Sequence, residues 1–409
     1  MNIVLEPGAA ALLDELHRAG FGAYAVGGCV RDSLLGLAPH DWDLCTAARP
    51  GQVMELFGED RCIPTGLQHG TVTVKRDGKL YEITTFRTEG RYSDGRHPDS
   101  VAFVPDLRED LARRDFTINA MAYSAEEGLC DPFGGREDLA RGVVRAVGEP
   151  LRRFGEDALR ILRLYRFAAR FGFAIDEATE AAAKQLASHL DCVSAERIEE
   201  ELNKLLAVPQ PGAYLEPEVL AFVLPELPPE ELTKARRRID ALPAGTEQVS
   251  ARWAALLLPL GETGARKALK RLKCSNARID GAAALVRECG EKTPDTLDKC
   301  DLRLQAKRLL GKYDLHTVQQ LTALWTALAP EEKASFDALR AEAEALTAQG
   351  ACCRISQLAV NGRDLMAAGA APGPGLRRVL EALLEEVITG RLPNEKTELL
   401  AFAAGFSAS

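Results

Sequence analysis

The sequence has no long apolar run and no paired cysteine motif. No stretch approaches the roughly eighteen apolar residues that a membrane helix needs, so no membrane partner is expected. The N-terminal segment lacks the basic start and apolar core of a signal peptide, and it predicts an amphipathic helix. The ten cysteines form no C-x-x-C pair, which leaves zinc and redox motifs unsupported. Such unpaired cysteines predict reduced thiols in a cytoplasmic protein.

An overall positive charge is also missing. The net charge of −9 disfavours indiscriminate binding to nucleic acid, but the basic residues are unevenly distributed. Residues 141–173 hold eight arginines against three acids, and residues 263–278 hold six basic residues and no acid. Such strips on an acidic protein are typical of a localised polyanion site, although a solvated helix face would explain either strip taken alone.

The character of the sequence changes near Pro150. Before it, short strands alternate with helices, and the clearest pattern is a hairpin in which residues 71–75 and 80–86 flank an Asp77-Gly78 turn. After it, helix-period patterns dominate and strands disappear. The sequence predicts an α+β fold with a small mixed or antiparallel sheet, followed by all-helical segments. The predicted parts are a head, a neck, a body and a tail: residues 1–150, 151–207, 208–330 and 331–409.

The stretch "YAVGGCVRDSLLGLAPHDWDLCT" begins with a possible anion site. Gly27 and Gly28 follow an apolar strand and precede a helix. Glycine permits positive φ and close backbone approach, so free amides and the helix N-terminus can face an anion. Arg31 is expected in the first turn of that helix, directed at the same place.

Two aspartates end the same stretch. Asp41 and Asp43 are expected on a strand, where residues i and i+2 share one face about 6.6 Å apart. Trp42 between them is then expected in the core. Two carboxylates on one face suit Mg²⁺, which prefers oxygen ligands and shares them with phosphates. With two metals, such a site can activate a hydroxyl and neutralise a leaving pyrophosphate.

Ordered blocks along residues 20–175 carry a family resemblance. "VGGCVRDSLLG…HDWDLCT" is followed by "GLQHGTVTV", "EITTFR", "RRDFTINAMAY", "DPFGG" and "GEDALRILRLYRFAARFGF". The series resembles class II template-independent nucleotidyltransferases, which include tRNA CCA-adding enzymes and bacterial poly(A) polymerases. The resemblance implies a polymerase-β-like nucleotidyltransferase head followed by helical neck, body and tail.

The resemblance also implies roles for residues of the head. Gly28 and Arg31 would contact the triphosphate, and Asp41 and Asp43 would bind the metal. Two residues of "RRDFTINA" match the motif that holds the ribose and phosphates: Arg114 and Asp115. A third catalytic carboxylate could come from the strand "YEITTF", at Glu82.

A second group of residues recurs every three positions in "EDALRILRLYRFAARF": Asp157, Arg160, Arg163 and Arg166. This stretch is expected to be helical, and its charges taken alone are consistent with a solvated face with local ion pairs. A carboxylate can accept from the amine of cytosine or adenine while a guanidinium donates to the ring nitrogen. Uracil and guanine carry a carbonyl and an N–H at these positions, which would clash with both the carboxylate and the guanidinium. The resemblance gives this base-reading role to Asp157 and Arg160, with Arg163 and Arg166 also lining the nucleotide site.

The product is narrowed by two further segments. Residues 87–100 resemble the mobile loop that this family uses for adding adenosine, which disfavours a CC-adding enzyme. The segment that begins at Val360 resembles the tail of short bacterial CCA-adding enzymes. The leading hypothesis is therefore addition of CCA to the 3′ end of tRNA from CTP and ATP, with release of pyrophosphate. The alternatives are an A-adding enzyme, a poly(A) polymerase and a catalytically inactive RNA-binding relative.

The body and tail are expected to bind the acceptor end and elbow of tRNA through phosphates, by shape more than by sequence. Part of this surface is expected on the second basic strip, at Lys267, Lys270, Arg271 and Lys273. The sequence sets no oligomeric state.

Overall fold

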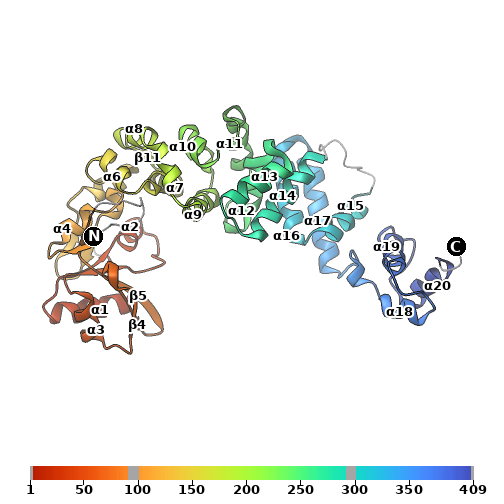
Figure 1. Ribbon diagram of the computed structural model, residues 1–409, viewed down its shortest axis with the longest axis horizontal. Coiled ribbons are helices and arrows are strands. Elements are labelled where there is room, and N and C mark those ends of the chain that lie inside the picture. Colours follow the sequence, from red (N-terminus) through yellow and green to blue (C-terminus); the bar gives the residue numbers. More distant parts are fainter. Residues whose placement is uncertain (1–2, 91–100, 292–300, 407–409) are drawn as a thin grey trace. The chain divides into compact units, whose positions relative to one another are not determined.

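The computed structural model describes residues 3–90, 101–291 and 301–406. The chain forms two compact units, Met1–Pro225 and Glu226–Ser409 (Figure 1). Within the described ranges, no helix has both the length and the apolar character required to cross a bilayer. The finer four-part division of the chain stays a prediction.

The first unit is built on a seven-stranded mixed sheet, with strand order β3-β4-β5-β2-β1-β8-β9. The pair β2 and β5 is parallel, and the other neighbours in this sheet are antiparallel. The bounds are β1 Ala23–Val26, β2 Leu44–Thr46, β3 Cys62–Gly66, β4 Thr71–Arg76, β5 Lys79–Thr85, β8 Ala122–Ser124 and β9 Gly128–Cys130. The predicted mixed sheet is confirmed.

The β4–β5 hairpin confirms the turn predicted from the sequence. Asp77 and Gly78 have φ of 50° and 75°, the left-handed conformations that a two-residue type I′ turn requires. A separate two-stranded sheet follows, formed by β6 (Arg87–Glu89) and β7 (Val101–Phe103). Residues 91–100, which make up most of the predicted mobile loop, lie outside the described residues.

The sheet is covered by helices α1 (Pro7–Arg18) and α3 (Pro50–Phe57), which pack against β1, β2 and β4 (Figure 1). Helix α1 begins where the Glu6 carboxylate accepts from the backbone amides of Gly8 and Ala9 at 3.0 and 3.1 Å. It buries Ala9, Leu12, Leu13 and Leu16, the i, i+3, i+4, i+7 pattern of an amphipathic helix. The predicted first helix is confirmed.

After residue 150 the first unit is mainly helical. Its longer helices there are α6 Pro150–Glu156, α7 Leu159–Phe171, α8 Glu177–Gln185, α9 Ala195–Ala207 and α10 Pro217–Val223. Ten of the thirteen residues of α7 are buried, so the solvated-face interpretation of this strip is wrong. The expectation that strands disappear also needs correction, because β11 (Ala174–Ile175) pairs in parallel with β10 (Val143–Val144).

The second unit is helical throughout its described part. The helices are α11 Leu232–Asp240, α12 Val249–Leu257, α13 Gly261–Arg271, α14 Asn276–Glu291, α15 Leu302–Lys312, α16 Leu315–Leu328, α17 Lys333–Ala348, α18 Gly362–Ala367, α19 Gly375–Ile388 and α20 Lys396–Phe406. Helices α12, α14, α16 and α17 pack together around buried Trp253 and Phe336. A separate apolar cluster that includes Leu383 and Leu399 holds the last helices together.

Candidate functional site

The site begins at the glycine turn between β1 and α2 (Gly28–Leu34). Gly27 has φ of 76°, and its amide donates to the carbonyl of Met121 at 3.0 Å. A Cβ on Gly27 would lie 2.8 Å from Nη1 of Arg114. Glycine is therefore required both for the backbone conformation and for the close approach of this guanidinium. Gly28 opens α2, as the sequence predicted.

Arg114 keeps donor capacity for a ligand. Its Nη2 lies 3.4 Å from Oδ2 of Asp110, a long contact, while its buried Nε has no hydrogen-bond partner among the described residues. Asp110 is fully buried, and burial alone would raise its pKa, but Arg113 and Arg114 hold that pKa below the usual range. An arginine with unused donors beside a glycine turn suits the binding of phosphate oxygens.

Replacing Gly27 with alanine should disturb Arg114. Both the positive φ and the 2.8 Å approach oppose a Cβ, so we expect KM for nucleotide to rise about tenfold. The matched control is Gly36→Ala, because Gly36 has φ of 72° with nothing within 4 Å of an added Cβ. Steady-state kinetics of the two variants separate the effect of the Arg114 contact from that of the positive φ. Equal KM values for the two variants would show that the Arg114 contact does not matter for nucleotide binding.

The aspartate pair does not lie on a strand, which corrects the prediction. Strand β2 begins at Leu44, and the amide of Val26 makes the last bond of this ladder to the carbonyl of Asp43 at 3.0 Å. Asp41 and Asp43 thus lie in the extended segment before β2, and both are exposed. Trp42 is half-buried, so its expected place in the core is wrong. Strict alternation of faces does not extend beyond the paired residues.

Sheet topology brings a third carboxylate to Asp43. Leu44 pairs with Ile83 across the parallel strands β2 and β5, which makes Glu82 the neighbour of Asp43. Asp43 is exposed at its surface, yet desolvation by surrounding protein raises its pKa. The carboxylates of Glu82 and Asp41 raise that pKa further, and Arg114 opposes the shift. Both neighbouring carboxylates therefore disfavour the negative charge of Asp43.

These carboxylates have the donor chemistry that a hard divalent cation requires. A bound cation would relieve the repulsion at Asp43, and Mg²⁺ prefers oxygen ligands of this kind. Within the described ranges, no group of three His, Cys, Asp or Glu side chains is close enough to hold a metal ion. The fit thus rests on Asp41 and Asp43 as ligands, with Glu82 nearby. His40 is the ion-pair partner of Asp41, at 3.5 Å.

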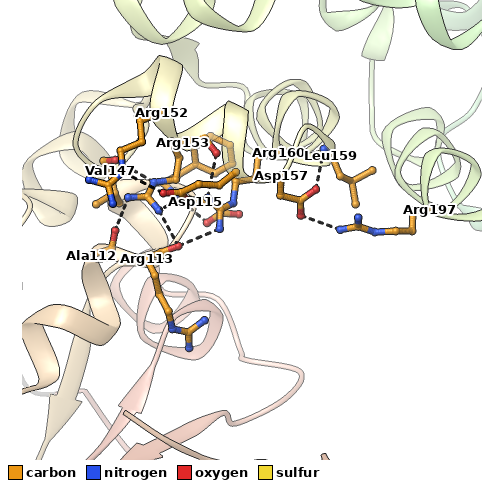
Figure 2. A network of polar contacts seen from close by, with 12 residues as sticks. Ala112, Arg113, Asp115, Val147, Arg152, Arg153, Asp157, Leu159, Arg160 and Arg197 are labelled. Atoms are coloured by element: carbon orange, nitrogen blue, oxygen red, sulfur yellow. Dashed lines mark hydrogen bonds and ion pairs between the residues drawn. The ribbon is translucent and has the colours of Figure 1, made fainter. Parts of the chain in front are cut away.

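Asp157 lies between α6 and α7, outside the helix where the sequence had placed it. Its Oδ1 accepts from the amide of Leu159 at 3.0 Å and so caps α7, while Oδ2 accepts from Nη2 of Arg197 at 2.8 Å (Figure 2). Arg197 comes from α9 and was not recognised in the sequence. Its only local signal is a single arginine within an acidic helix.

Arg160 is held by different partners from those of Asp157. It donates to Glu156 at 2.9 Å and to the carbonyls of Arg153 and Arg113 at 3.1 Å each (Figure 2). Arg153 donates to the carbonyl of Ala112 at 2.7 Å. These two buried arginines join helices α6 and α7 to the segment that leads into "RRDF". The structure therefore shows Asp157 and Arg160 as neighbours with separate protein partners.

The last two predicted arginines engage buried carboxylates. Arg163 donates through Nε and Nη2 to Oδ2 of Asp115 at 2.9 and 2.6 Å, and Arg166 donates to Glu201 of α9. Burial would raise the pKa of Asp115, but Arg163 and the amide of Asn119 hold it well below its usual range. Asp115 is thus occupied by protein groups, and Glu201 is a second partner that the sequence did not reveal.

The second basic strip is partly neutralised. Arg271 forms a two-point ion pair with Glu226 at 2.7 and 2.8 Å, and Arg266 contacts both Glu262 and Asp280. Lys267, Lys270 and Lys273 are exposed. Lys267 and Lys270 are therefore better placed than Arg271 for contacts with phosphate.

Three family models match successive parts of the chain. "Poly A polymerase head domain" matches residues 23–145, and "tRNA nucleotidyltransferase domain 2" matches residues 245–403. Residues 172–228 match "Probable RNA and SrmB- binding site of polymerase A". The first of these contains the glycine turn, the aspartate pair and Arg114.

Similarity to individual proteins extends over nearly the whole chain. A CCA-adding enzyme of Limosilactobacillus fermentum is 38% identical over 408 residues, which cover 96% of this chain and 95% of the relative. One from Geobacillus stearothermophilus is 37% identical over 402 residues, covering 96% and 95%. The crystal structure of Bacillus stearothermophilus CCA-adding enzyme in complex with CTP aligns with a TM-score of 0.82 at 34% identity, covering 99% and 98%. Thermotoga maritima CCA-adding enzyme complexed with tRNA aligns at 0.70 and 22% identity, covering 98% and 96%, which supports the fold alone.

Proposed function

The chain belongs to the family of CCA-adding enzymes, and on this basis we propose that it adds CCA to the 3′ end of tRNA. It transfers CMP and AMP from CTP and ATP and releases pyrophosphate. The observation that carries this proposal is the match to a CCA-adding enzyme at 38% identity across 95% of that relative, head and tail included. The glycine turn, the free donors of Arg114 and the aspartate pair supply the required chemistry within the matched region.

The head residues bind the triphosphate and the metal ion. The amides after Gly27, the guanidinium of Arg114 and that of Arg31 bind phosphate oxygens and orient the α-phosphate toward the tRNA hydroxyl. Asp41 and Asp43 would hold Mg²⁺, which would supply activation of the 3′ hydroxyl and neutralisation of the pyrophosphate charge. The support for these roles is the donor chemistry of the site together with the carboxylate repulsion around Asp43.

The neck residues read the base. The Asp157 carboxylate accepts from the exocyclic amine of cytosine or adenine, and Arg160 donates to the adjacent ring nitrogen. Arg163 and Arg166 line the same site and are held by Asp115 and Glu201. The support for this role is that Asp157 and Arg160 lie three positions apart at the start of α7.

The remaining parts serve the tRNA. We assign the body, residues 208–330, and the tail, residues 331–409, to binding the acceptor end and elbow, with Lys267, Lys270 and Lys273 contacting phosphates. The enzyme acts in the cytoplasm on this proposal, which the free thiols of the nine described cysteines support.

The test is primer extension on three tRNAs, ending before CC, after CC, or with complete CCA. With CTP and ATP, the first should gain three nucleotides and stop, and the second should gain one. The complete tRNA should gain none. With CTP alone, the tRNA that ends before CC should gain two nucleotides. Addition only after CC would instead identify an A-adding enzyme. A ladder of adenosines would identify a poly(A) polymerase, and no incorporation would refute the function.

A further inference from the structure

Arg31, the proposed triphosphate ligand, is held by a small polar network. Its side chain is only 4% exposed, and its Nε and Nη2 lie 2.8 and 2.6 Å from Oδ1 of Asp32. Its Nη1 donates to Asn119. The guanidinium also lies 5.2 Å and 4.9 Å from the ring centres of Phe167 and Phe171, within the range of cation–π attraction. The position of Arg31 is therefore set by its neighbours.

One of these neighbours is shared with α7. The other oxygen of Asp32 accepts from Nη2 of Arg170 at 3.1 Å, so one carboxylate bridges an arginine of the head and an arginine of the neck helix. A second bridge runs from Arg31 through Asn119, whose amide donates to Asp115 at 3.0 Å, and from there to Arg163. The two bridges and the α7 backbone between Arg163 and Arg170 together form a closed ring that includes Arg31.

The ring fastens one face of α7 to the head. Arg163, Phe167 and Arg170 follow the i, i+4, i+7 spacing that places side chains on one side of a helix. The two bridges are about two helical turns apart, with the Arg31–Phe167 contact between them. A helix held at two points cannot shift or rotate without disturbing Arg31.

We propose that Arg170 is a positioning residue that, through Asp32, holds Arg31 in the triphosphate site. This inference rests on the proposed function, in which Arg31 contacts the triphosphate. Because Arg31 contacts the triphosphate of CTP and of ATP alike, loss of Arg170 weakens the binding of both nucleotides by the same factor. It leaves the choice between bases unchanged, because Arg170 contacts neither Asp157 nor Arg160.

The first experiment compares Arg170→Gln with Arg141→Gln. Arg141 belongs to the same basic strip but forms an exposed ion pair with Glu137 at 2.7 Å, away from the ring. For Arg170→Gln we expect KM for CTP and for ATP to rise about tenfold with kcat within about twofold, the signature of lost binding that is uniform along the reaction. Arg170→Lys, which keeps the charge beside Asp32, should recover most of the loss. Unchanged KM values, or a change for one nucleotide alone, would overturn the proposal.

A second experiment tests whether Arg170 acts through Asp32. Binding of CTP and of ATP is measured by calorimetry without tRNA for Asp32→Asn, Arg170→Gln and the double variant. We expect the double variant to bind as weakly as Asp32→Asn alone, because residues acting through one network are not additive. Fully additive losses would refute the route through Asp32. If the variants show this pattern of nucleotide binding but the wild-type protein adds no CCA, the proposed function would be contradicted and this inference would stand.

Discussion

Asp41→Ala is expected to lower kcat for nucleotide addition by at least about a thousandfold. In the proposed mechanism the carboxylate holds a metal ion that stabilises the transition state by several kcal/mol, and each 1.36 kcal/mol is about tenfold in rate. The structural cost should be small, because the Asp41 side chain is 86% exposed and its ion-pair partner is the exposed His40. The measurement is single-turnover addition of CMP to tRNA that lacks CCA.

The control is Asp14→Ala, which removes an aspartate that is 58% exposed and pairs with Arg18 on α1, away from the site. This variant should retain wild-type activity. Removing divalent ions with EDTA should abolish nucleotide addition by the wild type. Adding Mg²⁺ should restore the activity of the wild type but not that of Asp41→Ala. An Asp41→Ala variant with more than about a tenth of wild-type kcat would exclude the carboxylate from the metal site.

Asp157→Ala is expected to loosen base selection, lowering the preference for CTP and ATP over UTP and GTP by about ten- to a hundredfold. The reason is that a buried partner of the base amine is lost, which is worth about 1–3 kcal/mol. Incorporation of each of the four nucleotides, measured separately as kcat/KM, gives the discrimination directly. Unchanged preference would remove Asp157 from base reading.

The structure shows that Asp157 also caps α7, so the loss of a cap needs its own control. Asp157→Ser keeps an oxygen that can accept from the amide of Leu159 but lacks the carboxylate. If Asp157 reads the base, the serine variant should lose selectivity as the alanine variant does, while recovering about 1 kcal/mol of stability in thermal unfolding. Recovery of selectivity by serine would assign the effect to the cap.

Local patterns were sufficient for much of the fold. The Asp77-Gly78 turn follows from the need for two residues with positive φ between strands, and the first helix follows from apolar spacing after Glu6 and Pro7. The change from mixed to helical structure near Pro150 likewise depends on periodicity within each segment. Such features depend on residues a few positions apart, so the sequence displays them directly.

The same reasoning was wrong where neighbouring strands set the outcome. Alternation predicted Asp41 and Asp43 on a strand, but β1 ends at Val26 where Gly27 turns the chain, and β2 therefore starts only at Leu44. Hydrogen bonding to a partner, and not the alternation itself, sets where a strand begins. The approach of Glu82 to Asp43 likewise depends on the parallel pairing of β2 with β5.

The sequence by itself determined which residues are proposed to carry the chemistry: the glycine turn, the two aspartates, Arg114 and the arginines after Asp157. These residues stand in short motifs whose composition reflects what phosphate, metal and base require. Only the tertiary structure decided how they are held, because the partners are remote in sequence: Arg197 for Asp157, Glu201 for Arg166 and Arg170 for Asp32. A charged side chain buried by folding must find an opposite charge wherever packing places one, and that choice leaves no local pattern.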